Sequence, residues 1–178
     1  SRIKKEETDV LVKVLGTAQD GGLPQAGCYC KNCIKAREER GFSRLVSSLA
    51  VLDLREKKFF LFDATPDLPL QLEMAFERLA LEKQGQKNSP HAVLLTHAHI
   101  GHYAGLFFFG YEVMSTFKLP VYCSSRMRSF LTENAPWSQL VRLENISLHT
   151  LSPEEEFSLS PRVSFIPFLV PHRDEYSD

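Results

Sequence analysis

The stretch Val93-Leu-Leu-Thr-His97-Ala-His99-Ile-Gly-His102-Tyr-Ala-Gly-Leu106 decides how this sequence is interpreted, because an apolar run leads directly into three closely spaced histidines. The run before His97 is typical of a short buried strand, and the loop after such a strand can aim several imidazoles at one point. Neutral imidazole is the commonest protein ligand for zinc and iron. The spacing differs from the helical zinc motif, in which two histidines four residues apart enclose a glutamate. We therefore predict a metal site at His97, His99 and His102, in preference to separate surface histidines.

A second cluster of potential metal ligands lies in the N-terminal part, in Gly27-Cys28-Tyr-Cys30-Lys-Asn-Cys33. Three of the four cysteines of the chain fall within these residues, and the fourth is Cys123. Disulfides between such close neighbours are sterically awkward, whereas three thiolates can close on one zinc ion. The pattern predicts a structural zinc site, a zinc knuckle over 28–33, that needs one further ligand. Buried thiols without a metal are the alternative.

The histidine segment resembles the signature of the metallo-β-lactamase superfamily, which is His-x-His-x-Asp-His after a buried strand and before a small-residue turn and a helix. His97, His99 and His102 match the three histidines, but Gly101 stands where the signature has Asp. The resemblance implies that His97 and His99 hold one metal, and that His102 belongs to a second metal position with the missing Asp. Because glycine has no side chain that can coordinate, we expect this second position to be weak or empty.

A later histidine extends the resemblance. Phe165-Ile-Pro-Phe-Leu-Val-Pro-His172 is an apolar, strand-like run that ends at a histidine. The superfamily has its next metal ligand at the end of such a strand, so the resemblance assigns His172 to the site of His97 and His99. Three protein ligands with an open position are typical of a catalytic metal. Asp174 fits either a carboxylate that supports a histidine or a solvated acid. The later ligands of the family, a bridging Asp and a final His, are expected after residue 178.

Three N-terminal motifs narrow the resemblance to one branch of the superfamily. They are Gly21-Gly-Leu-Pro-Gln25, Ser47-Ser-Leu-Ala-Val51 and Asp63-Ala-Thr-Pro-Asp67. They are similar to the branch that contains the PQQ-biosynthesis protein B and the phosphodiesterase of phosphonate utilisation. This branch carries a Cys-x-Cys-x-x-Cys structural zinc site, and the fourth zinc ligand is a histidine late in the chain. In the present sequence, Cys123 or His149 could substitute for that histidine. The family also uses an acidic residue at the position of Asp63 to support the metal loop. A capping role is the alternative for Asp63.

Hydrophobic periodicity predicts a layered α/β domain. Strands are predicted over 10–15, 48–54, 58–62, 91–95, 120–123, 146–151 and 162–170, helices over 66–80, 106–114 and 124–131, and a loop over 82–89. The resemblance implies the αβ/βα sandwich of the metallo-β-lactamase fold, incomplete at the C-terminus. We treat residues 1–178 as a single domain that covers the first two-thirds or so of the family domain.

Length and composition agree with this interpretation and argue against several partner classes. The 178 residues are 43% hydrophobic, which is enough for a core in one domain. A formal net charge of −1 gives no basic surface for nucleic acid or an anionic membrane. No apolar run approaches the roughly 20 residues that span a bilayer. Unpaired cysteines suit a reducing compartment, so we predict a cytoplasmic protein. The chain begins at Ser1, and an exported form with a removed leader is the alternative.

The predicted metal site indicates an enzyme. A cation held by three neutral imidazoles keeps its positive charge, lowers the pKa of bound water from ~15.7 toward ~7 and polarises an ester, amide or phosphoryl oxygen. We therefore expect a metal-dependent hydrolase that acts on such a bond in a small-molecule or peptide-like substrate. Zinc is expected in the structural site and zinc or iron in the catalytic site. The resemblance makes iron- and oxygen-dependent oxidation in cofactor biosynthesis the first alternative. A non-catalytic, metal-stabilised binding module is the second.

Overall fold

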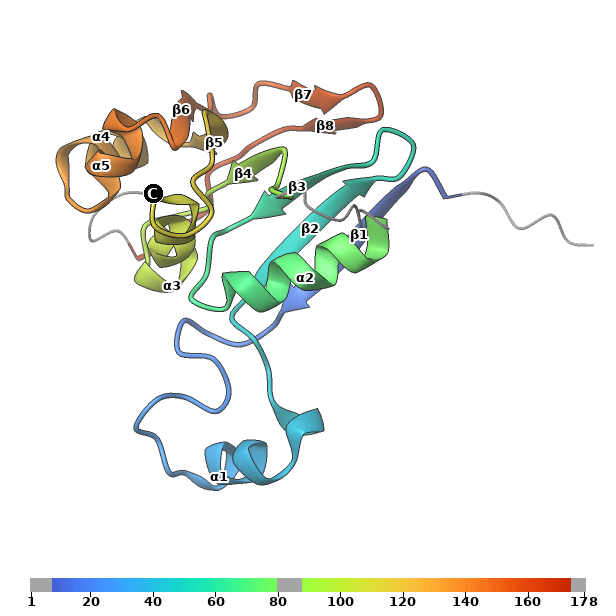
Figure 1. The fold of residues 1–178 in the computed structure, drawn as a ribbon, viewed down its shortest axis with the longest axis vertical. Helices are drawn as coiled ribbons and strands as arrows, with labels where there is room; N and C mark the ends of the chain where they lie inside the picture. The colour runs from blue at the N-terminus through green and yellow to red at the C-terminus, as the bar shows by residue number, and fades with distance from the viewer. Residues whose placement is uncertain (1–7, 80–87, 174–178) are drawn as a thin grey trace, which may run out of the picture.

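A six-stranded sheet forms the centre of the molecule in the computed structural model, which describes residues 8–79 and 88–173 (Figure 1). The strands lie side by side in sequence order: β1 (Val10–Gly16), β2 (Ser48–Asp53), β3 (Lys58–Phe62), β4 (Ala92–Leu94), β5 (Leu119–Cys123) and β6 (Ile146–Thr150). β1 to β3 pair antiparallel, and β3 to β6 pair parallel. The loops that follow the four parallel strands therefore meet at one edge of the sheet, which is where α/β proteins place their ligands.

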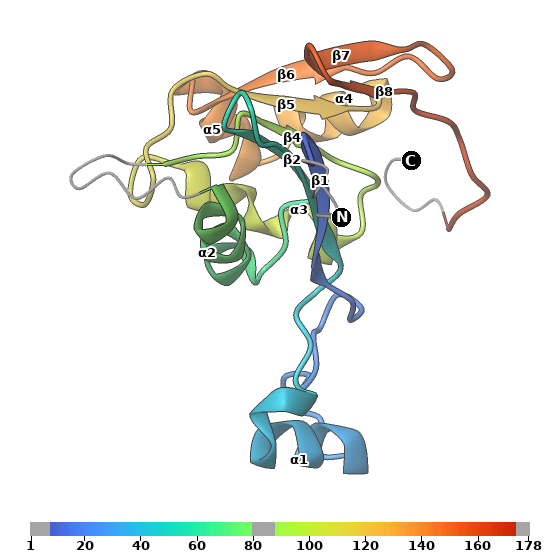
Figure 2. The ribbon, with the colours of Figure 1, turned by 90° about the vertical axis from the view of Figure 1, so that its right-hand side faces the viewer.

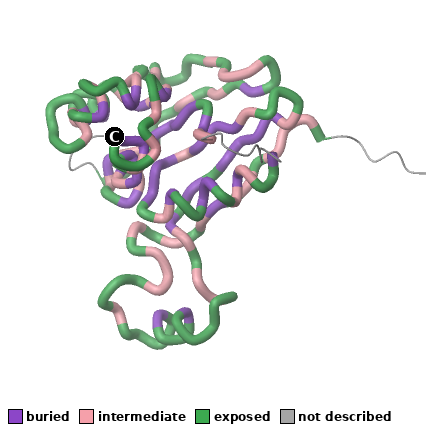
Figure 3. The backbone as a smooth tube through the Cα atoms, viewed as in Figure 1, coloured by how far each residue is buried: buried purple, intermediate pink, exposed green. Residues whose placement is uncertain are grey.

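The apolar runs in the middle of the sheet reflect burial on both faces. Phe59, Phe60 and Leu61 of β3 are all buried, and so are the three residues of β4. Strands covered on both sides lose the alternation of polar and apolar residues. The burial-coloured view shows this concentration of buried residues along the central strands (Figure 3). The six predicted strands of this sheet are confirmed, with small differences at their ends.

Helices cover one face of the sheet. α2 (Leu68–Leu79) buries Leu68, Leu72, Ala75 and Leu79, which repeat at intervals of three and four and form one apolar stripe against the core. α4 (Ser125–Glu133) begins after Ser124, whose side chain accepts a hydrogen bond from the backbone N–H of Met127. This N-cap confirms the predicted start of the helix. α5 (Trp137–Arg142), which was not predicted, follows α4 and packs beside it.

A small antiparallel sheet, β7 (Phe157–Ser160) and β8 (Val163–Phe165), packs on the opposite face. Its hairpin is fastened to the end of β2 by a buried carboxylate. Asp53 Oδ2 accepts a hydrogen bond from Ser160 Oγ at 2.6 Å, and Arg162 Nη1 lies 3.7 Å from Asp53 Oδ1. Burial raises the pKa of Asp53, but the Ser160 hydroxyl, neighbouring backbone N–H groups and Arg162 outweigh it, so the pKa is lowered.

The cysteine segment stands apart from the sheet. Both ribbon views show α1 (Lys31–Glu38) at the far end of two neighbouring stretches of chain, well below the strands (Figures 1 and 2). The short 3-10 helix η1 (Arg40–Phe42) follows it. Where the two stretches meet the domain, a bridge between Leu23 and Arg44 and another between Ala18 and Val46 hold them together. The segment between the two bridges, which includes the knuckle, α1 and η1, therefore projects from the domain and is not part of its core. We call this segment the arm.

Two predictions about elements near the histidines are wrong. The helix predicted over 106–114 is replaced by the 3-10 helix η2 (Ala104–Phe109), which ends because Gly110 takes an extended backbone. The strand predicted over 162–170 stops at Phe165, because Pro167 has no N–H for a strand ladder. The loop predicted over 82–89 falls largely outside the described residues, as does Asp174. Among the helices that the structure describes, none is long and apolar enough to cross a bilayer.

Candidate metal centre

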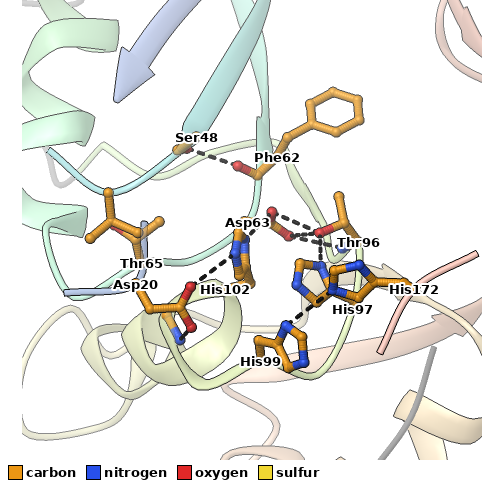
Figure 4. Close-up of polar contacts among 12 residues, drawn as sticks. Asp20, Ser48, Phe62, Asp63, Thr65, Thr96, His97, His99, His102 and His172 are labelled. Atoms are coloured by element: carbon orange, nitrogen blue, oxygen red, sulfur yellow. Dashed lines mark hydrogen bonds and ion pairs between the residues drawn. The ribbon is translucent and has the colours of Figure 1, made fainter. Parts of the chain in front are cut away.

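The histidines lie at the edge of the sheet where the parallel strands end. Asp63 directly follows β3, and Thr96 and His97 follow β4, so the pairing of these two strands brings the three residues together. His99 is the N-cap of α3 (Ile100–Tyr103), which carries Gly101 and His102. Figure 4 shows Asp63 between Thr96 and His102, with Asp20 on the other side of His102. Local strand and turn structure thus delivers the predicted residues to one place.

Three of the predicted ligands converge. Ring nitrogens of His97, His99 and His172 all lie within 4.8 Å of one another, and His172 Nε2 is 3.1 Å from His99 Nδ1. His172 reaches this position from an irregular segment and not from the end of a strand as predicted. Zinc binds imidazole nitrogen at about 2.0–2.1 Å, so three nitrogens at these separations can reach one ion. The spacing and the donor set fit a metal bound by three histidines.

Thr96 connects Asp63 to His97. The Thr96 hydroxyl donates to Asp63 Oδ2 at 2.8 Å. The hydroxyl oxygen of Thr96 also lies 2.8 Å from His97 Nδ1. A hydroxyl has one proton to donate, and here that proton points at the carboxylate. The Thr96 oxygen therefore accepts from His97 Nδ1–H, which leaves His97 Nε2 as the ligand atom. The expected supporting role of Asp63 thus has a geometric basis, although its contact with His97 passes through Thr96.

His97 is held in the neutral form that a ligand needs. Burial, followed by repulsion from His102, lowers the pKa of His97 to about 4. Only the unprotonated nitrogen of a neutral imidazole can bind a cation. The ring is therefore ready to coordinate throughout the neutral pH range.

His102 is not one of the three convergent histidines. Its ring centroid lies 4.2 Å from that of His97, and its two nitrogens face two carboxylates. Its Nδ1 is 2.7 Å from Asp63 Oδ2, and its Nε2 is 3.5 Å from Asp20 Oδ1. Burial lowers the pKa of His102, but the carboxylates of Asp63 and Asp20 outweigh it, so the pKa is raised. Asp20 also accepts a hydrogen bond from the backbone N–H of Gly101 at 3.0 Å. Asp20 was missed as a site residue. The available signal was its place in the loop after β1, which ends at the same sheet edge as β3.

The three cysteines of the knuckle also come together. Their sulfur atoms all lie within 4.8 Å of one another, with Cys33 buried and Cys30 exposed. A hydrogen bond from the Cys33 backbone N–H, reinforced by the neighbouring thiols, lowers the pKa of Cys30 to about 7. This group includes neither Cys123 nor His149. Cys123 is buried in β5, where burial raises its pKa to about 12, and His149 stacks on Tyr122 at 5.0 Å.

A cavity of about 1160 Å³ opens beside the histidines. Its wall combines Asp20, His99 and His102 with Phe130, Asn134 and Trp137 from α4, α5 and the loop between them. Ligand pockets commonly pair an aromatic wall with a few polar groups in this way. The aromatic run over 106–114 is not part of this wall; Leu106 and Phe109 are buried in the core, which was the preferred interpretation of that run.

Known protein sequences that are similar to this chain identify its family. Residues 58–178 match a family model described as a beta-lactamase superfamily domain. The coenzyme PQQ synthesis protein B of Methylococcus capsulatus is 35% identical over 129 residues, which cover 71% of this chain and 41% of that protein. The corresponding protein of Rhizobium meliloti is 32% identical over 171 residues, 92% of this chain and 54% of that protein. The chain thus spans about half the length of the curated relatives it matches.

Solved structures show the same fold. The Zn(2+)-bound PqqB from Methylobacterium extorquens superposes with a TM-score of 0.73 at 27% identity, over 90% of this chain and 56% of that one. A diphosphatase from the PhnP family superposes with a TM-score of 0.59 at 23% identity, over 84% of this chain and 53% of that one. The second likeness is evidence of the fold alone. Together with the observed layers, these structures confirm the predicted α/β fold class.

Proposed function

The chain belongs to the beta-lactamase superfamily, and from this premise we propose that it is a metal-dependent hydrolase whose catalytic metal is held by His97, His99 and His172. The observation that carries the proposal is the convergence of these three side chains from two distant segments, with ring nitrogens within 4.8 Å of one another beside a cavity. Three histidine ligands leave positions open for water and substrate, as in catalytic and not structural sites.

A zinc or iron ion bound there supplies a Lewis acid that acidifies water and polarises an ester, amide or phosphoryl oxygen. The chain's own residues prepare the site for it. Burial keeps His97 neutral, and Thr96 fixes the tautomer that presents His97 Nε2. Asp63 holds Thr96 through both its backbone N–H and its hydroxyl. Such outer contacts set the direction of a ligand and raise its affinity for the metal.

The substrate that we propose is a small molecule or a short peptide-like group. The cavity has room for a molecule of that size, and its aromatic rings at Phe130 and Trp137 offer flat apolar surfaces. Asn134 and the carboxylate of Asp20 provide polar contacts on the same wall. These features favour a substrate with a ring or an acyl chain next to the bond that is cleaved.

We also propose that Cys28, Cys30 and Cys33 hold a structural zinc that stabilises the arm. The mutual closeness of the sulfur atoms and the lowered pKa of Cys30 support this assignment. Arg37 of α1 donates to the backbone oxygens of Cys28 and Gln25, which further fixes the loop. The ion would take the place of the hydrophobic core that so small an arm lacks.

Iron- and oxygen-dependent oxidation in cofactor biosynthesis is the second candidate function. It is favoured by the similarity to the coenzyme PQQ synthesis protein B over most of this chain. Three histidines with open positions also suit iron, which activates oxygen. A binding module without catalysis is the remaining candidate, and the convergence of the three histidines beside a cavity argues against it.

One experiment separates these candidates. The protein is purified without added metal, its zinc and iron are measured by elemental analysis, and ester, amide and phosphodiester substrates are tested with and without oxygen. Hydrolysis that needs no oxygen supports the proposal, whereas dependence on both iron and oxygen supports oxidation. We expect His172→Ala to lose one metal per chain and the activity, and His149→Ala, remote from the metal group, to keep both. Full activity in His172→Ala would contradict the proposal.

A further inference from the structure

The arm carries a concentrated positive charge. Residues 23–44 contain five lysine and arginine residues and two glutamates, which gives a formal charge of +3 in a chain whose formal net charge is −1. One zinc ion with three thiolates would leave the arm at +2. Lys35 pairs with Glu39, whereas Lys31 and Arg40 are exposed and form no ion pair with any residue that the structure describes. A patch of one sign on a projecting segment attracts a surface of the opposite sign.

The arm also presents an aromatic ring beside its cations. Tyr29 is 76% exposed, and the guanidinium of Arg37 lies 4.8 Å from the centre of its ring. Arg37 is itself held in place, because it donates to the backbone oxygens of Cys28 and Gln25. Tyrosine and arginine are enriched where proteins contact one another. The tip of the arm therefore has the composition of a protein interface.

A surface of the opposite charge lies in the turn between β6 and β7. Its three consecutive glutamates, Glu154, Glu155 and Glu156, are exposed and form no ion pair within the described part of the chain. We call these three residues the acidic turn. The backbone N–H of Glu154 donates to the oxygen of Pro167 at 2.7 Å, which holds the turn beside a segment where Phe168 is 73% exposed. This surface thus also combines charge with an exposed ring.

The two surfaces cannot meet within one molecule. Both ribbon views place α1 of the arm and the connection from β6 to β7 at opposite ends of the long axis (Figures 1 and 2). Two molecules that lie side by side and antiparallel bring the arm of each against the acidic turn of the other. A two-fold axis relates the two contacts, and two-fold dimers are the commonest assemblies of identical chains. The net charge of −1 per chain adds little repulsion between the copies.

We propose that two copies of this chain form an antiparallel dimer in which the arm of each binds the acidic turn of its partner. A second copy is favoured over a nucleic acid, because the residues outside the arm carry a formal charge of −4 and would repel a long polyanion. Contacts between exposed charges are individually weak, so the dimer is reversible and sensitive to salt. The inference goes beyond the proposed function and does not depend on the metal at the histidines.

The test exchanges the two charges. The zinc-loaded protein is studied by sedimentation velocity at concentrations up to about 0.5 mM. The arm-reversed variant is Lys31→Glu with Arg40→Glu, and the turn-reversed variant is Glu155→Lys with Glu156→Lys. Glu154 is left unchanged, because it has a left-handed backbone with a φ of 64°. The variant Lys31→Arg with Arg40→Lys keeps both charges and is the matched control. Elemental analysis of each variant confirms that the knuckle keeps its zinc.

We expect wild type and the control to dimerise equally. Raising NaCl from 0.1 M to 1 M shortens the Debye length from about 10 Å to about 3 Å and should raise the Kd at least about tenfold. Each reversed variant alone should be monomeric, because its arm and its acidic turn then have the same sign. An equimolar mixture of the two should dimerise again, since both contacts of the mixed pair join opposite charges.

Three results would overturn the inference. A wild type that stays monomeric over the whole concentration range would leave the arm to a different acidic partner. A dimer that survives either reversal would use another surface. Monomers in the mixture would show that the arm and the acidic turn do not contact each other. If the arm-reversed variant loses its zinc, the turn-reversed variant, whose changes lie far from the knuckle, still decides, because its persistence as a dimer would refute the contact.

Discussion

Replacing Thr96 by valine isolates the contribution of one hydroxyl to the metal centre. Valine has nearly the shape of threonine, and the backbone N–H of residue 96 still donates to Asp63 Oδ1 at 2.8 Å. What is lost is the link from Asp63 Oδ2 through the hydroxyl to His97 Nδ1, two contacts of 2.8 Å each. Without that acceptor, His97 is free to rotate and to present either nitrogen.

The size of the effect follows from the position of Thr96. Removing an outer contact of a metal ligand typically lowers metal affinity by about 10–100-fold. Thr96 is exposed, so water can take over part of the role of the hydroxyl. We therefore expect the lower end of this range, about a tenfold loss, which corresponds to ~1.4 kcal/mol.

The assay is competition for zinc between the protein and a chromophoric chelator of known affinity. Thr96→Ser keeps the hydroxyl and is the matched control, and it should bind zinc as wild type does. The melting temperature of each metal-free variant shows whether the fold is intact. If Thr96→Val holds zinc as tightly as wild type, the hydroxyl does not orient His97. If Thr96→Ser is as weak as Thr96→Val, the methyl group and not the hydroxyl matters.

Four further predictions concern other parts of the molecule. Cys30→Ser should lose one zinc per chain and lower the melting temperature, by elemental analysis and calorimetry, because zinc in such a site supplies folding free energy. Iodoacetamide at pH 8 should label the knuckle cysteines of the chelated, folded protein but not Cys123, as mass spectrometry of peptides will show, since Cys123 is buried with a pKa of about 12. Asp53→Asn should destabilise the fold by about 1–3 kcal/mol at pH 7 in urea unfolding. Because the folded pKa of Asp53 is lowered, this difference should be complete above about pH 4 and shrink as the pH falls through the folded pKa. Gly101→Ala should cost about 1–3 kcal/mol of stability, because its Cβ meets Asp20; unchanged stability would mean that the loop yields freely.

The sequence predicts best what depends on neighbouring residues. The strand over Ala92–Leu94, the hairpin of β2 and β3, and the cap at Ser124 follow from local periodicity and turn chemistry, and all are confirmed. The meeting of Asp63 with Thr96 follows from parallel strands that end together.

Features that depend on distant contacts are harder to predict. The run over 106–114 is apolar enough for the predicted helix, but the structure has a 3-10 helix that ends before Gly110. Gly105, in the same 3-10 helix, lies where a Cβ would be 2.1 Å from Thr65 O, so this segment packs closely against a distant loop. His172 reaches the site without a strand to deliver it. Asp20 is 81 residues from Gly101, and the order of the strands in the sheet, rather than the residues next to either position, brings them into contact.

The loop after β1 links the histidine cluster to the cysteine cluster. It carries Asp20, which accepts a hydrogen bond from Gly101 N–H beside the histidines, and, a few residues later, Cys28 of the knuckle, with the Leu23–Arg44 bridge between them. Two ions that bind to one shared segment are coupled reciprocally. If the first ion changes the binding affinity of the second by some factor, the second changes the affinity of the first by the same factor. If the proposed zinc in the arm favours the loop conformation that carries Asp20, it would change the affinity of the proposed histidine site for its metal. Chelating that zinc would then alter metal binding at the opposite end of the loop.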